Sequence, residues 1–204
     1  ALPIYYEVIP VHLLRDGGEQ RTAEYARKNP NRLVPLFTDG AHTIHQSLAI
    51  IEYIEEIQAT PALLPKTAID RAWVRAVAMD IAIEIHPMNN LRVLRYLIKT
   101  LGVSVEAKDT WNQHWMSLGL TSLEKQLSTD ARVGRFAYGD QPSLIDICLV
   151  PQIFNALSAK LDINTYPTLI KIFNECMKLP AFIDASWEKQ IDAEGSNPSA
   201  PPQE

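Results

Sequence analysis

Gln46 and Ser47 stand directly before an apolar helical pattern, where they could bind an anion. Ser47 can cap the helix, and the free N–H groups of a helix's first turn attract carboxylates and phosphates. Gln46 can add a hydrogen bond from its side chain. We therefore interpret the pair either as a carboxylate site or as a plain helix cap with nothing bound.

The stretch "NPNRLVP", from Asn29 to Pro35, offers a second backbone site. Pro35 fits the start of a strand, since proline cannot donate to a sheet ladder. If the Val34–Pro35 bond is cis, the turn exposes the backbone N–H and C=O of Val34 to a peptide-like ligand. A trans proline is the commoner alternative, because only a small minority of X–Pro bonds are cis.

Polar residues cluster around Pro87 in "IHPMNNLRVLRYL", namely His86, Asn89, Asn90 and Arg92. Such groups either satisfy the backbone groups that a proline frees or line a cleft where a ligand binds. The sequence indicates no metal site, because no Cys/His spacing is typical of zinc. It also lacks the glycine-rich nucleotide-binding motifs and the G-x-S-x-G motif.

Composition places the chain among ordinary globular proteins. It has 204 residues and a net charge of -5, which argues against a non-specific nucleic-acid binder. No apolar run is long enough for a membrane span, and the N-terminus does not resemble a signal peptide. Cys148 and Cys176 lie in apolar helical patterns, so we expect buried free thiols and a cytoplasmic location, with a disulfide or a catalytic thiol as alternatives.

The N-terminal part reads as strand, helix, hairpin and helix. Pro3–Leu14 is rich in β-branched and aromatic residues, "RTAEYARKN" is a short helical pattern, and "TDGA" marks a hairpin turn. From Ser47 onward, apolar residues recur at helical spacing. We expect a small α/β domain over residues 1–60 and a proline-containing linker over 61–67.

The rest of the chain reads as helical. We expect an all-helical domain over residues 68–192 and a disordered Pro/Ser-rich tail over 193–204. Ser143 and Asp146 form an S-x-x-D capping pattern, which predicts a core helix without chemistry of its own. The expected helices cover Ile69–Ile85, Met88–Leu101 after the Pro87 break, Asp109 to about Leu127, a helix from Ser143, and "YPTLIKIFNECMKL".

Four stretches, "NPNRLVP", "HQSLAIIEYIEE", "IHPMNNLRVL" and "GDQPSLIDICLVPQIFNAL", resemble the glutathione transferase superfamily, and within it the zeta class. The resemblance extends to about Asp192. It implies an α/β plus all-α fold, with a thioredoxin-like N-terminal domain, incomplete here, before an all-helical glutathione transferase C-terminal domain. It also implies a homodimer, glutathione as cofactor and a small-molecule substrate, with neither nucleic acid nor membrane as partner.

The resemblance assigns ligand contacts by position. The backbone of Val34, beside Pro35, would hold the cysteinyl part of glutathione. Gln46 and Ser47 would hold the γ-glutamyl end, and Gln20 would approach the glycyl end. These assignments favour the cis form of the Val34–Pro35 bond.

Four residues near Pro87, namely His86, Asn90, Leu91 and Arg92, match further ligand contacts of the family. Arg92 is our candidate for binding a substrate carboxylate, because a guanidinium forms bidentate pairs with carboxylates. The alternative is an arginine that simply faces solvent.

Two departures from the zeta class concern catalysis. The Ser-Ser/Cys-x-Ser-x-Arg motif, which would supply the thiol-activating group, has no counterpart, so the catalytic residue is unknown. The chain begins at a point that resembles the second strand, and we expect roughly 20–25 residues before Ala1. Ser158 stands where zeta members commonly carry an arginine, which leaves the substrate open.

The reaction that the resemblance implies is the cis–trans isomerisation of maleylacetoacetate or maleylpyruvate. Glutathione thiolate adds to the cis double bond, the resulting single bond rotates, and the thiolate leaves. The alternatives are a transferase that conjugates glutathione to electrophiles and a non-catalytic binding or structural protein.

Overall fold

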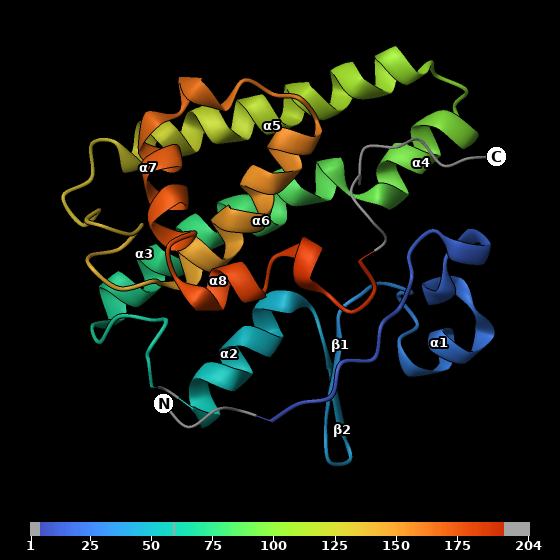
Figure 1. Ribbon diagram of the computed structural model, residues 1–204, viewed down its shortest axis with the longest axis horizontal. Coiled ribbons are helices and arrows are strands. Elements are labelled where there is room, and N and C mark those ends of the chain that lie inside the picture. The colour runs from blue at the N-terminus through green and yellow to red at the C-terminus, as the bar shows by residue number, and fades with distance from the viewer. Residues whose placement is uncertain (1–4, 59, 194–204) are drawn as a thin grey trace. The chain divides into compact units, whose positions relative to one another are not determined.

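A computed structural model describes residues 5–58 and 60–193 of the chain. The chain divides into two compact units (Figure 1). Among the described residues, the first unit covers 5–58, 60–62 and 187–193, and the second runs from Leu63 to Ser186. Nearly all of the predicted tail, residues 194–204, lies outside the described residues.

The first unit contains a small antiparallel hairpin and short helices. Strand β1 (Leu36–Asp39) pairs with β2 (His42–His45) in a register that joins Leu36 to His45 and Asp39 to His42, which confirms the predicted hairpin. Gly40 in the connecting turn has a φ of 56°, a conformation that glycine adopts at little cost. The elements are η1 (Arg15–Gly17), η2 (Glu19–Arg21), α1 (Ala23–Lys28), β1 (Leu36–Asp39), β2 (His42–His45), α2 (Ser47–Ile57) and η6 (Trp187–Lys189).

The prediction of a strand over Pro3–Leu14 is wrong for those residues of the segment that the structure describes. Residues 5–12 form no ladder, and the side chains of Tyr5, Tyr6 and Ile9 are exposed. A strand is stable only when a neighbour pairs its backbone groups, and within the described residues the sheet contains β1 and β2 alone. Local residue preference therefore predicted an extended segment, which lacks a partner strand here. Pro3 lies outside the described residues.

The second unit is a helical bundle around one apolar core. Its elements are α3 (Ala68–Met79), η3 (Asp80–Ile85), η4 (His86–Asn89), α4 (Leu91–Lys99), α5 (Val105–Leu127), α6 (Leu144–Ser158), η5 (Ile163–Thr165), α7 (Pro167–Cys176) and α8 (Pro180–Asp184). Fully buried side chains from four of these elements, α3, α5, α6 and α7, form the core: Val74, Val77, Met116, Leu120, Ile145, Leu149, Ile153, Leu169 and Ile172.

In this unit, capping side chains mark the starts of helices α5 and α6. The Asp146 carboxylate accepts hydrogen bonds from the backbone N–H and the hydroxyl of Ser143, both at 2.7 Å, which confirms the predicted start of α6. Burial raises the pKa of Asp146, against the lowering effect of these hydrogen bonds. Helix α5 begins earlier than the predicted Asp109, because the Ser104 hydroxyl accepts from the N–H of Ala107 at 3.1 Å.

The predicted long helix up to Ile85 is present, but its last part is not α-helical. After Met79 the chain forms the π-helical segment η3 and then the 3-10 segment η4. The helix predicted over Met88–Leu101 is present as α4, but it begins later than predicted, at Leu91, because Asn90 has an extended backbone, with ψ at 141°, and separates η4 from α4.

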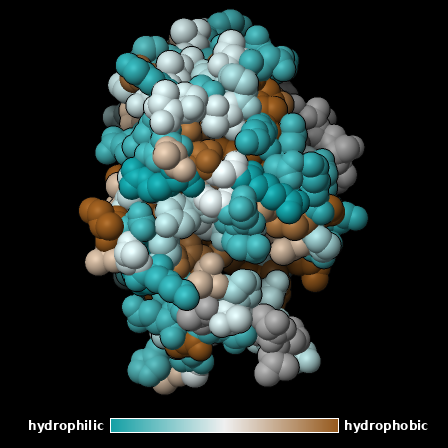
Figure 2. Space-filling view, turned by 90° about the vertical axis from the view of Figure 1, so that its left-hand side faces the viewer, coloured by the Kyte–Doolittle hydropathy of each residue, from teal (hydrophilic) through white to brown (hydrophobic). Residues whose placement is uncertain are grey.

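Hydrophilic side chains predominate on the face shown in Figure 2, with hydrophobic side chains scattered among them. No helix in the described ranges is both long and apolar enough to cross a bilayer.

Both cysteines are free; Cys176 is fully buried, as predicted, and Cys148 is partly buried. Burial raises the pKa of Cys148 to about 11, so this thiol is protonated near neutral pH.

Candidate functional site

The start of α2 presents an open helix N-terminus. The helix begins at Ser47, as predicted, but the prediction that Ser47 caps it is wrong: Gln46 occupies the N-cap position, with a φ of 75° and a ψ of 118°, and its side chain makes no capping hydrogen bond. Both residues are exposed, and the first turn carries no acidic side chain. In any α-helix the first N–H groups lack a carbonyl partner within the helix, and the helix dipole adds positive potential there. This end of α2 can therefore bind a carboxylate.

The turn before β1 presents a second open backbone segment. The Val34–Pro35 bond is cis, as predicted, and Val34 is 41% exposed. The carbonyl of Leu33 accepts two hydrogen bonds from inside the unit, from the Tyr25 hydroxyl and from the Asn29 side-chain amide, each at 2.8 Å. The hydrogen bonds to Leu33 thus hold the turn in place, while Val34 itself remains exposed.

The hairpin brings these two segments together. Leu36 is paired with His45, so one further step along the antiparallel register places Pro35 beside Gln46. The exposed backbone of Val34 and the N-terminus of α2 therefore lie next to each other. A peptide-like ligand with a terminal carboxylate can contact both at once.

Gln20 is buried, unlike the exposed residues Gln46, Ser47 and Val34. Its side chain is 7% exposed, and its amide N–H donates to the carbonyl of Leu13 at 3.5 Å. Its oxygen Oε1 is buried and has no hydrogen-bond partner among the described residues. Gly18, with a φ of 111°, leaves room for this side chain, because a Cβ there would lie 2.7 Å from Oε1. The free acceptor is suited to an amide N–H of a peptide-like ligand.

The other predicted contacts belong to the second unit and lie at the junction of η4 and α4. The Asn90 side chain accepts from the N–H of Arg92 at 3.1 Å and so caps α4. Arg92 is exposed within the first turn of α4, and Leu91 is half-buried. His86 as a whole residue is exposed, yet neighbouring protein atoms partly desolvate its imidazole, which lowers its pKa, so the ring is neutral near pH 7.

Sequence reasoning missed the residues that support the turn of Val34. Asn29 is 2% exposed, and its Oδ1 also accepts from the N–H of Asn31 at 3.1 Å. Burial raises the pKa of Tyr25, so its hydroxyl stays protonated and can donate. The one available signal was the position of Asn29 immediately before Pro30 in a loop, where asparagine often bonds to its own backbone surroundings.

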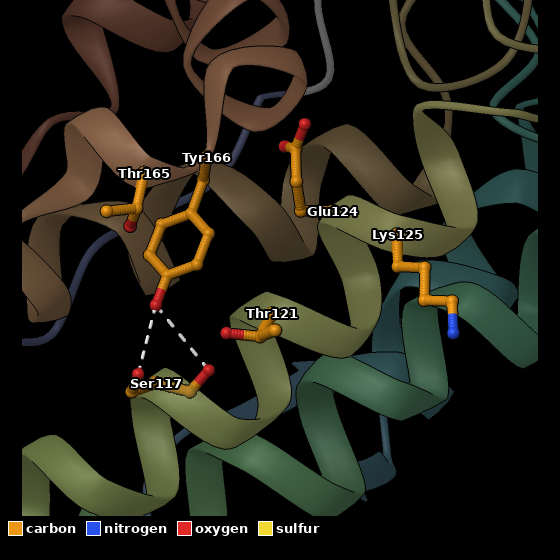
Figure 3. Close-up of a pocket in the computed structure, with 6 residues that line it drawn as sticks. All are labelled: Ser117, Thr121, Glu124, Lys125, Thr165 and Tyr166. Atoms are coloured by element: carbon orange, nitrogen blue, oxygen red, sulfur yellow. Dashed lines mark hydrogen bonds between the residues drawn. The ribbon is translucent and has the colours of Figure 1, made fainter.

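A separate cavity of about 430 Å³ lies in the second unit beside α5 and the start of α7 (Figure 3). The Tyr166 hydroxyl points toward Ser117 and lies 3.2 Å from its hydroxyl. The Glu124 carboxylate accepts the N–H groups of Thr168 and Leu169, each at 3.0 Å, and so caps α7. These contacts stabilise the bundle, and none of the predicted ligand residues lines the cavity.

Residues 1–56 match the family model described as the glutathione S-transferase N-terminal domain. The chain is 47% identical, over 93% of its length and 87% of the relative's, to a probable maleylacetoacetate isomerase of Vibrio cholerae.

Two solved structures are similar over most of the chain. A holo structure of maleylpyruvate isomerase, a bacterial glutathione S-transferase of the zeta class, is 40% identical with a TM-score of 0.84, over 86% of this chain and 83% of that one. A maleylacetoacetate isomerase from Methylobacterium extorquens AM1, with bound malonate and GSH, is 32% identical with a TM-score of 0.83, over 88% of this chain and 84% of that one. The chain therefore belongs to the zeta class of the glutathione S-transferases, the family of the maleylacetoacetate and maleylpyruvate isomerases.

Proposed function

We propose that this protein catalyses the glutathione-dependent cis–trans isomerisation of a maleyl dicarboxylate, either maleylacetoacetate or maleylpyruvate. The observation that carries the proposal is the 47% identity to the Vibrio cholerae relative over 93% of the chain. The similarity extends over nearly the whole chain, so the proposal does not rest on one unit alone.

The first unit suits glutathione. The tripeptide has a γ-glutamyl carboxylate for the N-terminus of α2, at Gln46 and Ser47, and a cysteinyl backbone for the accessible N–H and C=O of Val34. The cis Val34–Pro35 turn and the register of the hairpin support this assignment, because they set the two backbone sites side by side. The unpartnered oxygen of Gln20 can accept an amide N–H near the glycyl end. Bound glutathione supplies a thiol that adds reversibly to the conjugated double bond.

Arg92 is proposed to bind a carboxylate of the substrate. Its guanidinium is exposed within the first turn of α4, where the helix dipole adds to its positive charge. A related isomerase structure contains malonate, a dicarboxylate, together with GSH. His86, Asn90 and Leu91 are proposed as neighbouring ligand contacts.

The protein is further proposed to be a homodimer in the cytoplasm. Helix α4 has a basic polar face, yet none of its residues is fully buried within the chain. Leu94, Leu97 and Ile98 on its apolar side are only half-buried, so a second copy could cover them. The two free cysteines are consistent with a reducing compartment.

The fate of glutathione distinguishes isomerisation from conjugation. The intact natural protein is incubated with maleylacetoacetate or maleylpyruvate and a limiting amount of glutathione, and free thiol is followed alongside the trans product. We expect many turnovers with the thiol undiminished. Consumption of one glutathione per product would identify a conjugating transferase instead, and binding without turnover would identify a non-catalytic protein.

A further inference from the structure

Helix α5 holds the segment that precedes α4 at two points. The indole N–H of Trp111 donates to the backbone carbonyl of Met88 at 3.1 Å. Two turns further along α5, Gly119 lies against Ile85, which is 2% exposed, and a Cβ at Gly119 would overlap the Ile85 side chain. The two points are about 12 Å apart along α5. They therefore fix both the end of η3 and the turn η4.

The direction of α4 depends on this turn. Pro87 provides no N–H, so the regular helical ladder cannot continue through it. The chain instead changes from a π-helix to a 3-10 turn and then to the cap at Asn90, whose own N–H reaches the carbonyl of Pro87 at 3.4 Å. Arg92 follows immediately, and its N–H is held by the Asn90 side chain. A shift at Met88 would consequently move the cap and the first turn of α4.

We infer that Trp111 is a positioning residue, whose hydrogen bond to Met88 sets the location of Arg92 for the substrate carboxylate. The inference rests on the proposed function of Arg92. The indole is itself held in place, because its ring packs against Trp115 with centroids 5.6 Å apart. Trp111 thus acts through the backbone of η4 and touches neither the substrate nor glutathione in this role.

Trp111→Phe tests the inference, with Trp115→Phe as the matched control. Both substitutions replace an indole by a phenyl ring in the same Trp111–Trp115 ring pair, so both disturb that contact alike. Only the first also removes the N–H that bonds Met88. In the intact natural protein we expect Trp111→Phe to raise the KM for the dicarboxylate about five-fold, as for a hydrogen bond worth about 1 kcal/mol. The KM for glutathione and the kcat should match those of the control.

Amide hydrogen exchange provides a measurement that does not depend on activity. Peptides covering residues 86–94 should exchange about five-fold faster in Trp111→Phe than in Trp115→Phe, while peptides from α6 should not differ. Equal exchange in the two variants would overturn the inference, as would an unchanged KM for the dicarboxylate. Faster exchange in a protein without isomerase activity would leave Trp111 as the anchor of η4, but it would refute the proposed function and with it the link to substrate binding.

Discussion

Asn29→Asp most sharply probes the hydrogen bonds that support the cis Val34–Pro35 turn, where we propose that glutathione binds. The two side chains have the same shape, so the new carboxylate can still accept from the N–H of Asn31. It cannot donate to the Leu33 carbonyl, which now receives one hydrogen bond at 2.8 Å from the amide of Asn29. A carboxylate oxygen of the new side chain would then face the carbonyl oxygen of Leu33, at a position where Asn29 is only 2% exposed. We expect the free energy of unfolding to fall by about 2–4 kcal/mol, from one lost hydrogen bond and one poorly solvated charge.

The assay is calorimetric titration with glutathione, with Asn31→Asp as the control. Asn31 is exposed and engages this network through its backbone N–H, so its substitution adds the same charge without removing a side-chain donor. We expect Asn29→Asp to weaken glutathione binding about ten-fold, or about 1.4 kcal/mol, and the control to stay within about two-fold of wild type. Equal affinity of the two folded variants would refute the view that the hydrogen bond to Leu33 holds Val34 in its binding geometry.

Three further outcomes are expected. Ser47→Ala should weaken glutathione binding by about 1–2 kcal/mol in calorimetry, since a hydrogen bond to a charged carboxylate is lost; wild-type affinity would exclude Ser47 from the site. Gly18→Ala should lower the melting temperature and the glutathione affinity together, because a Cβ at a φ of 111° would press on the Gln20 side chain; an unchanged melting temperature would contradict this. The hydrogen bond from Arg132 lowers the pKa of Asp130 to about 2 in the folded protein. The ionised Asp130 therefore stabilises the fold fully above the pKa of about 4 that it has in the unfolded chain, and this stabilisation is lost as the pH falls toward 2. The stability difference between wild type and Asp130→Asn should therefore shrink over that range in chemical denaturation, and a constant difference would be evidence against the ion pair.

Local motifs predicted those parts of the molecule that depend on neighbouring residues. The Asp-Gly turn predicted the hairpin, the Ser143 and Asp146 pair predicted the start of α6, and the resemblance of "NPNRLVP" favoured the cis bond that the structure contains. Each of these features is determined by a few consecutive side chains. Their recognition therefore needed no knowledge of the rest of the fold.

The missed features depend on residues far apart in the chain. Pro3–Leu14 has the composition of a strand, but pairing requires a neighbour that composition cannot reveal. Ile85, the last residue of the π-helical segment, occupies the space left by Gly119, and the bond between Trp111 and Met88 spans 23 residues. Sequence periodicity predicted the helices on either side and could not indicate how their junction is held.

Gln46 illustrates the same limit within a single residue. The sequence predicted it as a polar residue before a helix, and the structure adds a φ of 75°. Residues without glycine's freedom adopt such a conformation mainly where the surrounding structure enforces it, often at functional sites. Here Gln46 lies between the end of β2 and the start of α2, where the N-terminus of the helix is exposed.

The isomerisation rate with and without glutathione tests the central claim most directly. Maleylacetoacetate and maleylpyruvate are offered separately to the intact natural protein, and loss of the cis-substrate absorbance is recorded at saturating glutathione and in its absence. We expect glutathione-dependent turnover of at least one substrate, and we expect Arg92→Ala to raise the KM for the dicarboxylate more than the KM for glutathione. No turnover of either substrate, or equal turnover without glutathione, would contradict the proposed function.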